Sequence, residues 1–262
     1  FPKNHPFDLI LKTILFYRPK MGMEVVTSCR APAGSGIGGS SSLSIALHGA
    51  LNCLTQSGFE RYQLIEIAKN IETQIIKAPT GWQDFFAALY GGVQAIQPGM
   101  VRTKSVPISL NLDQLTNRFI LCYTGKPHQS GINNWDVFKK ALDGHRIVNQ
   151  KLERIAQITL DMERELRNNR LNKIPNLLNE EWKARKALAP KISTPEMDRM
   201  ITSAKRKGAL AAKVCGAGGG GCVAFFVPPK FKKKVMAELI NQGGEVLNFR
   251  FVKRGLVVKK HN

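Results

Sequence analysis

Apolar residues in the first third of the chain recur at intervals of three and four, the spacing that places them on one side of a helix. This pattern predicts helices over 7–17 and 61–77, and a small-residue version of it predicts a helix over 44–54. A fourth helix is expected over 81–89, where a polar turn leads into an alanine-rich stretch that a pair of glycines ends.

Short apolar runs between these helices and towards the end of the chain predict β-strands. The predicted strands are 23–29, 93–96, 118–123, 223–227, 246–252 and 256–258. Between about 135 and 188 the periodicity is helical, so we expect a helical second lobe. Thr194 and Pro195 predict a helix start and Gly208 its end, and a basic amphipathic helix is expected over 230–241.

The composition indicates a globular protein, since 262 residues with 43% hydrophobic content can form a large domain or two smaller lobes. No apolar run approaches the roughly 20 residues of a membrane-spanning helix, and the start lacks the layout of a signal peptide. The five cysteines are scattered, which argues against a disulfide framework or a zinc site. These features favour a cytoplasmic enzyme.

The charge is strongly positive, a formal +20 from 39 Lys and Arg against 19 Asp and Glu. Such an excess is compatible with binding of nucleic acid, anionic lipid or a phosphorylated substrate, and the charge alone does not distinguish these partners.

A glycine-rich loop over 32–42 reads Pro-Ala-Gly-Ser-Gly-Ile-Gly-Gly-Ser-Ser-Ser. Glycines let a backbone wrap closely around an anion. The hydroxyls of Ser40, Ser41 and Ser42 lie where a helix is expected to begin, and the amides and positive dipole end of a helix attract phosphate. The sequence therefore predicts a nucleotide as ligand.

Other nucleotide and nucleophile loops fit this segment poorly. Gly34, Gly36 and Gly39 satisfy the dinucleotide pattern, which is a weak signal alone, and Pro32 and the serine run are not part of it. A Walker loop is excluded because no Lys-Ser or Lys-Thr pair follows the glycines, and a nucleophile elbow because no serine has the required glycine after it.

A second glycine loop, 216–221, lies about 180 residues further on. The first loop resembles the phosphate loop of the GHMP kinases, the superfamily of galactokinase, homoserine kinase and mevalonate kinase, and the second resembles their C-terminal glycine motif. The resemblance implies an α+β fold of two lobes. An N-terminal ATP-binding lobe over 1–115, like domain 2 of ribosomal protein S5, would be followed by a ferredoxin-like, helical C-terminal lobe over 116–262.

Within that superfamily the chain is most similar to bacterial sugar kinases, especially the D-glycero-D-manno-heptose 7-phosphate kinases. This likeness depends on the runs 81–84, 123–125 and 191–195, and on the approach to the second glycine loop. It covers nearly the whole chain, but the superfamily's first motif has no counterpart before Phe1. We therefore expect the first segment of the N-terminal lobe to be absent from this sequence.

The resemblance implies a role for particular residues. It places ATP phosphates on the backbone of Pro32, Gly34, Ser35, Gly36, Gly38, Gly39, Ser40 and Ser41. It implies that Ser40 and Glu72 bind Mg²⁺ and that Asp84 is the catalytic base. Without the resemblance, Glu72 can equally be an exposed position of a helix and Asp84 a helix cap. The expected substrate residues are Thr124, Gly125, Ser130, Gly218 and Gly219.

One departure from the family is that Gly39 replaces the first of two serines, so we expect somewhat weaker nucleotide contact with magnesium binding kept at Ser40.

The predicted function is transfer of the γ-phosphate of ATP to a hydroxyl of a sugar or sugar phosphate. The acceptor that the resemblance favours is the anomeric hydroxyl of D-glycero-D-manno-heptose 7-phosphate. Fucokinase-like, galactokinase-like and mevalonate-type kinases are the rivals. A non-catalytic, nucleic-acid-binding relative is a rival of another class, because the N-terminal lobe resembles an RNA-binding fold. The expected partners are a small sugar substrate and a second copy of the chain, with no membrane and no nucleic acid.

Overall fold

The computed structural model describes residues 5–127 and 132–260, which divide into two compact units. The first unit runs to Ala31, resumes over Gly38–Pro107 and ends with the segment from Val252. The second comprises Pro32–Ile37 and Ile108–Phe251. The sequence predicts one boundary after residue 115. In the structure the main division follows Pro107, Pro32–Ile37 belongs to the second unit, and Val252–Asn262 belongs to the first.

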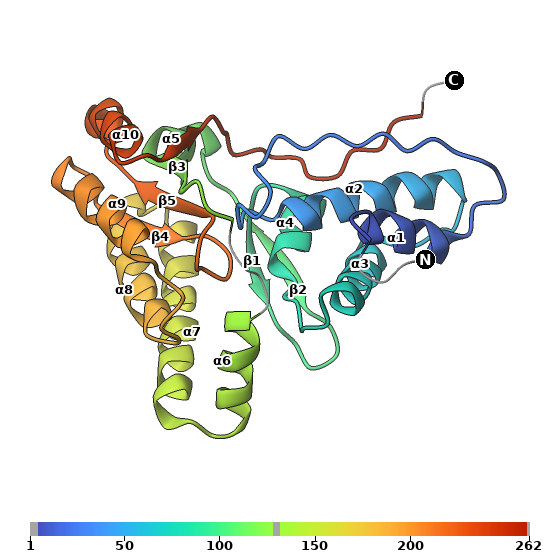
Figure 1. The fold of residues 1–262 in the computed structure, drawn as a ribbon, viewed down its shortest axis with the longest axis horizontal. Coiled ribbons are helices and arrows are strands. Elements are labelled where there is room, and N and C mark those ends of the chain that lie inside the picture. The colour runs from blue at the N-terminus through green and yellow to red at the C-terminus, as the bar shows by residue number, and fades with distance from the viewer. Residues whose placement is uncertain (1–4, 128–131, 261–262) are drawn as a thin grey trace. The chain divides into compact units, whose positions relative to one another are not determined.

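Helices dominate the first unit (Figure 1). Its elements are α1 (Asp8–Tyr17), α2 (Gly39–Leu54), α3 (Arg61–Ile76), α4 (Gln83–Tyr90), β1 (Val93–Gln97) and β2 (Lys104–Ile108), the last of which ends at the unit boundary. The strands β1 and β2 form a two-stranded sheet. The four predicted helices are confirmed, and α2, α3 and α4 each present an apolar face to a shared core. That core consists of Ile45, Leu64, Ile65, Ala68, Phe85, Phe86 and Leu89.

A buried polar pair joins α1 to α2. The Tyr17 hydroxyl lies 3.1 Å from Nδ1 of His48, which is fully buried, and Nε2 of His48 has no hydrogen-bond partner within the part of the chain that is described. Burial lowers the pKa of His48 to about 4 and raises the pKa of Tyr17 to about 12. The imidazole is therefore neutral at neutral pH, on the helix that begins at the first glycine loop.

The last segment of the chain returns to the first unit at the end of α4. The Gly92 amide donates to the Val252 carbonyl (2.7 Å), and the Leu256 amide donates to the Leu89 carbonyl (3.1 Å). A Cβ on Gly91 would lie 2.5 Å from the carbonyl carbon of Arg254, so only glycine permits this approach. The C-terminal segment thereby fixes the helix that carries Asp84.

Two predicted strands of the first unit are wrong. Residues 23–29 and 256–258 are in neither a helix nor a strand. Both segments have apolar side chains exposed, such as Val26 at 84% and Val257 at 58%. An apolar run has the side chains typical of a strand, but a strand forms only where a neighbouring strand accepts and donates its backbone hydrogen bonds.

The second unit is built on an antiparallel sheet with helices packed against it (Figure 1). Its elements are α5 (Leu112–Arg118), β3 (Phe119–Tyr123), α6 (Ile132–Leu142), α7 (Arg146–Arg167), η1 (Leu171–Lys173), α8 (Ile174–Lys186), α9 (Pro195–Arg206), β4 (Ala211–Val214), β5 (Cys222–Phe226), η2 (Pro229–Phe231), α10 (Lys232–Asn241) and β6 (Glu245–Leu247). The strand order β4-β5-β3-β6 is that of a strand–helix–strand–strand–helix–strand unit. The predicted ferredoxin-like lobe is confirmed.

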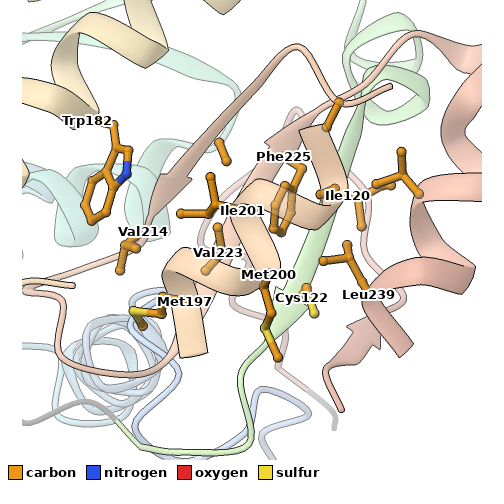
Figure 2. Packing of buried hydrophobic residues seen from close by; sticks show 14 of the residues in the cluster. Ile120, Cys122, Trp182, Met197, Met200, Ile201, Val214, Val223, Phe225 and Leu239 are labelled. Atoms are coloured by element: carbon orange, nitrogen blue, oxygen red, sulfur yellow. The ribbon is translucent and has the colours of Figure 1, made fainter. Parts of the chain in front are cut away.

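The core of the second unit lies between this sheet and the helices. Figure 2 shows Met200 and Ile201 of α9 against Val223 and Phe225 of β5. The Phe225 and Val223 side chains are fully buried. The sheet that carries both ends of the second glycine loop is therefore anchored along its length.

Several boundaries differ from the prediction. The helical lobe is confirmed as three helices, and Thr194 caps α9 by accepting a bond from the Met197 amide. The elements β2, α5 and β4 are not predicted, and β6 is shorter than the predicted strand 246–252. The strand β4 is buried but contains two alanines and a lysine, so it lacks the run of large apolar residues from which a buried strand is predicted.

Within 5–127 and 132–260 no helix is long and apolar enough to cross a membrane.

Candidate active site

The first glycine loop has a backbone of alternating handedness. Gly34, Gly36 and Gly38 have positive φ angles of 65°, 73° and 76°, while Ser35 and Ile37 between them do not. Alternation of this kind turns successive amide groups towards one side and forms a concave anion site. The alternate glycines of the sequence are therefore required by backbone conformation.

The helix that follows begins without a side-chain cap. Gly38 is the N-cap of α2 and provides no side-chain acceptor, so the first amides of α2 remain donors. Ser40 is exposed and Ser41 is buried. The hydroxyl of Ser40 can therefore reach a ligand at this helix start, whereas Ser41 offers its backbone amide.

Asp84 lies against the end of this loop. A Cβ built on Gly38 would lie 3.2 Å from Cβ of Asp84 and 3.3 Å from its Cγ, and Asp84 is exposed. The N-cap of α4 is Trp82, so Asp84 is the second residue of the helix and not its cap. The carboxylate is thus placed beside the predicted phosphate-binding backbone by a close approach to a glycine.

The turn that presents Asp84 is held by a carboxylate that the sequence does not indicate. Oε1 of Glu66 accepts from Nε1 of Trp82 (2.7 Å) and from the Tyr62 hydroxyl (3.0 Å), and Lys69 lies 3.2 Å from Oε2. Burial alone would raise the pKa of Glu66, but the hydrogen bonds from Trp82, Lys69 and Tyr62 outweigh it and lower that pKa. In sequence Glu66 is one more polar position of an amphipathic helix, so no signal identifies it.

Glu72 is half-buried on α3 and accepts a bond of 3.2 Å from the Thr80 hydroxyl. No group of three or more His, Cys, Asp or Glu that could hold a metal ion exists among the residues described. Mg²⁺ commonly binds one or two carboxylates and takes its other ligands from phosphate and water. Glu72 with the Ser40 hydroxyl matches that donor chemistry, because both groups offer oxygen.

In the second unit, the two glycine loops contact each other through their backbones. The Cys222 amide donates to the Ser35 carbonyl (2.7 Å). A Cβ on Gly36 would lie 3.0 Å from the Cys215 carbonyl oxygen, and one on Gly216 would lie 3.1 Å from Cα of Gly36. The first part of the first glycine loop is therefore supported by the second loop.

The second loop is itself held by neighbouring segments. The Thr124 amide and hydroxyl both donate to the Gly221 carbonyl, at 3.0 and 2.9 Å. The Gly219 amide donates to the Ile192 carbonyl (3.0 Å), and a Cβ on Gly218 would collide with that carbonyl. Of the predicted substrate residues, Thr124, Gly218 and Gly219 thus have structural contacts of their own.

The other predicted substrate residues differ. Gly125 has φ +77°, and a Cβ added to it would meet nothing within 4 Å, so one side of this residue is open. Ser130 lies outside the described residues, as does His128.

A buried carboxylate, that of Glu181, lies beside two half-buried cations at the base of the second loop. Nζ of Lys213 is 2.6 Å from Oε1 of Glu181, and Nε of Arg185 is 2.5 Å from the same oxygen. Burial, and then the charge of Arg185, lowers the pKa of Lys213. Oε2 of Glu181 is buried without a hydrogen-bond partner in the described part of the chain.

Comparison with known proteins identifies similar chains. The family pattern "GHMP kinases N terminal domain" matches residues 8–92, and "GHMP kinases C terminal" matches residues 162–245. The D-glycero-alpha-D-manno-heptose 7-phosphate kinase of Campylobacter jejuni is 26% identical over 247 residues, covering 92% of this chain and 72% of that protein. The mevalonate kinase of Pyrococcus abyssi is 22% identical over 263 residues, covering 98% of this chain and 74% of that protein.

Among solved structures, a D-glycero-D-manno-heptose 1-phosphate kinase from Bacteroides thetaiotaomicron superposes with a TM-score of 0.73 at 22% identity. The match covers 99% of this chain and 78% of that one, and it bears on the fold alone. Both family patterns occur in the predicted order and each contains one of the two glycine loops. The chain belongs to the GHMP kinases and has their two-lobe α+β fold.

Proposed function

We propose that this chain transfers the γ-phosphate of ATP to a hydroxyl of a sugar phosphate. The observation that carries the proposal is the position of Asp84 against Gly38, at the end of a backbone shaped for anions. Phosphoryl transfer needs a cradle for phosphate, a divalent cation and a group that orients or deprotonates the acceptor. The chain offers a candidate for each.

The phosphate cradle is the backbone of the first loop and of the α2 start, from Gly34 to Ser41. Its amide groups stabilise the charge of the phosphates without a lysine. Ser40 and Glu72 hold Mg²⁺, which supplies neutralisation of phosphate charge when bound. The Thr80 hydroxyl donates to one oxygen of Glu72, and this carboxylate would hold the metal together with the Ser40 hydroxyl.

Asp84 accepts the proton of the acceptor hydroxyl. It is the second residue of α4 and so lies in the first turn of that helix. Glu66, through Trp82, fixes the turn before it. An exposed carboxylate so held can meet an incoming hydroxyl without rearranging the helix.

For the acceptor we propose a heptose 7-phosphate, phosphorylated at its anomeric hydroxyl. Support comes from the 26% identity to a protein of that name and from the +20 charge, which suits an anionic substrate. The residues Thr124, Gly125, Ser130, Gly218 and Gly219 remain its predicted substrate residues. The cytoplasmic location and the homodimer also stay predictions.

The test is ADP production in the presence of Mg²⁺ and ATP with a panel of sugars, sugar phosphates that include heptose 7-phosphate, and mevalonate. Asp84→Asn is measured beside Asp113→Asn, because Asp113 is likewise the exposed second residue of its helix. We expect turnover with heptose 7-phosphate that is lost in Asp84→Asn and kept in Asp113→Asn. Turnover with mevalonate alone would refute heptose 7-phosphate as the acceptor. Full activity of Asp84→Asn would refute the assignment of Asp84 as the base.

The metal site has a separate test. Glu72→Gln keeps the shape of the side chain and removes its charge, so the Mg²⁺ concentration for half-maximal activity should rise about tenfold, as for loss of one charged ligand contact. An unchanged Mg²⁺ requirement would remove Glu72 from the site. RNA binding with a steep salt dependence, in a chain that produces no ADP, would instead favour the nucleic-acid-binding relative.

A further inference from the structure

Cys215 and Cys222 stand opposite each other at the two ends of the second glycine loop. In the β4–β5 ladder Val214 is paired with Val223, so the next pair outward is Cys215 with Cys222. The Cys215 amide donates to the Cys222 carbonyl at 2.8 Å, which continues the ladder by one step. The six residues between them, 216–221, form the loop, and the two cysteines form its neck.

This pairing is close to the geometry of a disulfide. Residues directly opposite in an antiparallel pair have Cβ atoms about 4.5–5.5 Å apart and point to the same face of the sheet. A disulfide needs a Cβ separation of about 3.8 Å, with Cα atoms about 4.4–6.8 Å apart. The Cys215–Cys222 pair is hydrogen-bonded and so lies at the wide end of that range, and its Cβ atoms must approach by about 1–2 Å to form the bond.

The nearest other thiol is on the wrong face. In the β3–β5 ladder Tyr123 is opposite Cys222, while Cys122 is opposite Val223. Since side chains alternate along a strand, Cys122 points away from Cys222 and into the core of Figure 2. Cys29 and Cys53 belong to the first unit.

The two thiols differ in exposure and therefore in chemical role. Cys215 is half-buried, whereas Cys222 is fully buried and burial raises its pKa to about 12. Cys215 is thus the thiol that attacks an oxidant, and Cys222 is the thiol that completes the bond.

The neck is also in contact with the phosphate loop. The carbonyl of Cys215 touches Gly36, and the amide of Cys222 holds the carbonyl of Ser35. A bond that draws the two cysteines together moves both of these groups. Because Gly36 packs directly against the Cys215 carbonyl, a shift of the neck would act on the backbone of the first loop.

We propose that Cys215 and Cys222 form a reversible disulfide across the neck of the second glycine loop, and that this bond weakens nucleotide binding by the first loop. The second part rests on the proposed function. The oxidant is a small disulfide such as glutathione disulfide, and the reduced pair is the form competent for ATP.

The exchange has two steps. The Cys215 thiolate attacks one sulfur of glutathione disulfide, forming a mixed disulfide and releasing one glutathione thiolate. The Cys222 thiolate then attacks the Cys215 sulfur and releases the second glutathione thiolate. Two protons leave the cysteine thiols and end on the two glutathione molecules, so two cysteines are oxidised by two electrons and one disulfide is reduced.

The bond can be detected without any assay of activity. Trypsin cuts after Lys213 and Lys230, so one peptide, 214–230, contains both cysteines and no other. After exposure of the full chain to glutathione disulfide and alkylation, we expect this peptide to lack both alkyl groups and to be lighter by two hydrogens. Dithiothreitol should reverse the change. If the 214–230 peptide is fully alkylated while the exposed Cys29 has reacted with glutathione, the proposal is wrong.

The effect on the site is measured by calorimetry with ATP and Mg²⁺. Oxidation should weaken ATP binding about tenfold or more, as for the loss of one hydrogen bond to a charged phosphate oxygen. Cys215→Ser and Cys222→Ser should lose this response to oxidation. Cys122→Ser, a buried thiol on the neighbouring strand, is the matched control and should keep it.

The outcomes separate this proposal from the proposed function. If the disulfide forms and ATP binding does not change, the regulatory part is refuted. If the reduced chain does not bind ATP at all, the proposed function fails, and peptide mapping still decides whether the pair exists. Circular dichroism of each serine variant establishes that a lost response does not come from unfolding.

Discussion

Replacement of Gly38 by alanine tests the contact between the first loop and Asp84. Two effects are expected, because Gly38 has φ +76° and its Cβ would lie 3.2–3.3 Å from the Asp84 side chain. Left-handed backbone costs a residue with a side chain about 1–2 kcal/mol. The close contact additionally requires Asp84 to move by a few tenths of an ångström. Since about 1 Å of misplacement can cost 10²-fold in rate, we expect kcat to fall about tenfold.

The matched control is Gly58→Ala. Gly58 has φ +71° and nothing within 4 Å of a Cβ, so it carries the backbone penalty without the contact. Urea unfolding should show a similar loss, about 1–2 kcal/mol, in both variants. Steady-state kinetics with ATP and the active acceptor should show a lower kcat only for Gly38→Ala. Equal kcat values in the two variants would refute the reasoning that the Gly38–Asp84 contact positions the carboxylate.

Three further predictions concern stability and support of the site. His48 has a pKa of about 4 in the fold against 6.5 unfolded, so stability is complete above pH 6.5 and falls by about 3 kcal/mol towards pH 4; urea midpoints across this range should show the loss, and His48→Gln should reduce it. Glu66→Gln should lower the free energy of unfolding by about 1–3 kcal/mol and also lower kcat, because the charged acceptor for Trp82 is removed; unchanged tryptophan fluorescence and kcat would contradict this. Gly221→Ala, whose Cβ would lie 2.6 Å from a carbonyl oxygen, should weaken ATP binding far more than Gly243→Ala, which has a similar φ and open space; calorimetry distinguishes them.

The helices can be predicted because each has a periodic apolar face, and that signal is local. The predicted strand 23–29 is wrong because a strand also depends on a partner strand, which no local pattern reveals. The short strand β4 escapes prediction for the opposite reason, because Ala211 and Ala212 pair with large residues on β5 and need no bulk of their own.

At the site, the sequence indicates the two glycine loops and Asp84 but not what joins them. The contact of Asp84 with Gly38 depends on how α4 docks beside α2, and the bond from Cys222 to Ser35 depends on a sheet that closes far along the chain. Glu66 escapes prediction because its partner Trp82 lies outside its own helix. Such tertiary contacts give a residue its role without leaving a spacing in the sequence.

The docking of Ser35 on Cys222 has a consequence for how the protein is made. The first half of the first glycine loop belongs to the unit whose remaining residues begin at Ile108, so the hairpin that supports it is synthesised long after the loop. Helices α1 to α4 are built from local contacts and can form on the ribosome much earlier. A nascent chain therefore has the helix that follows the first glycine loop before the residues that support this loop, and the loop gains its bond to Cys222 only later.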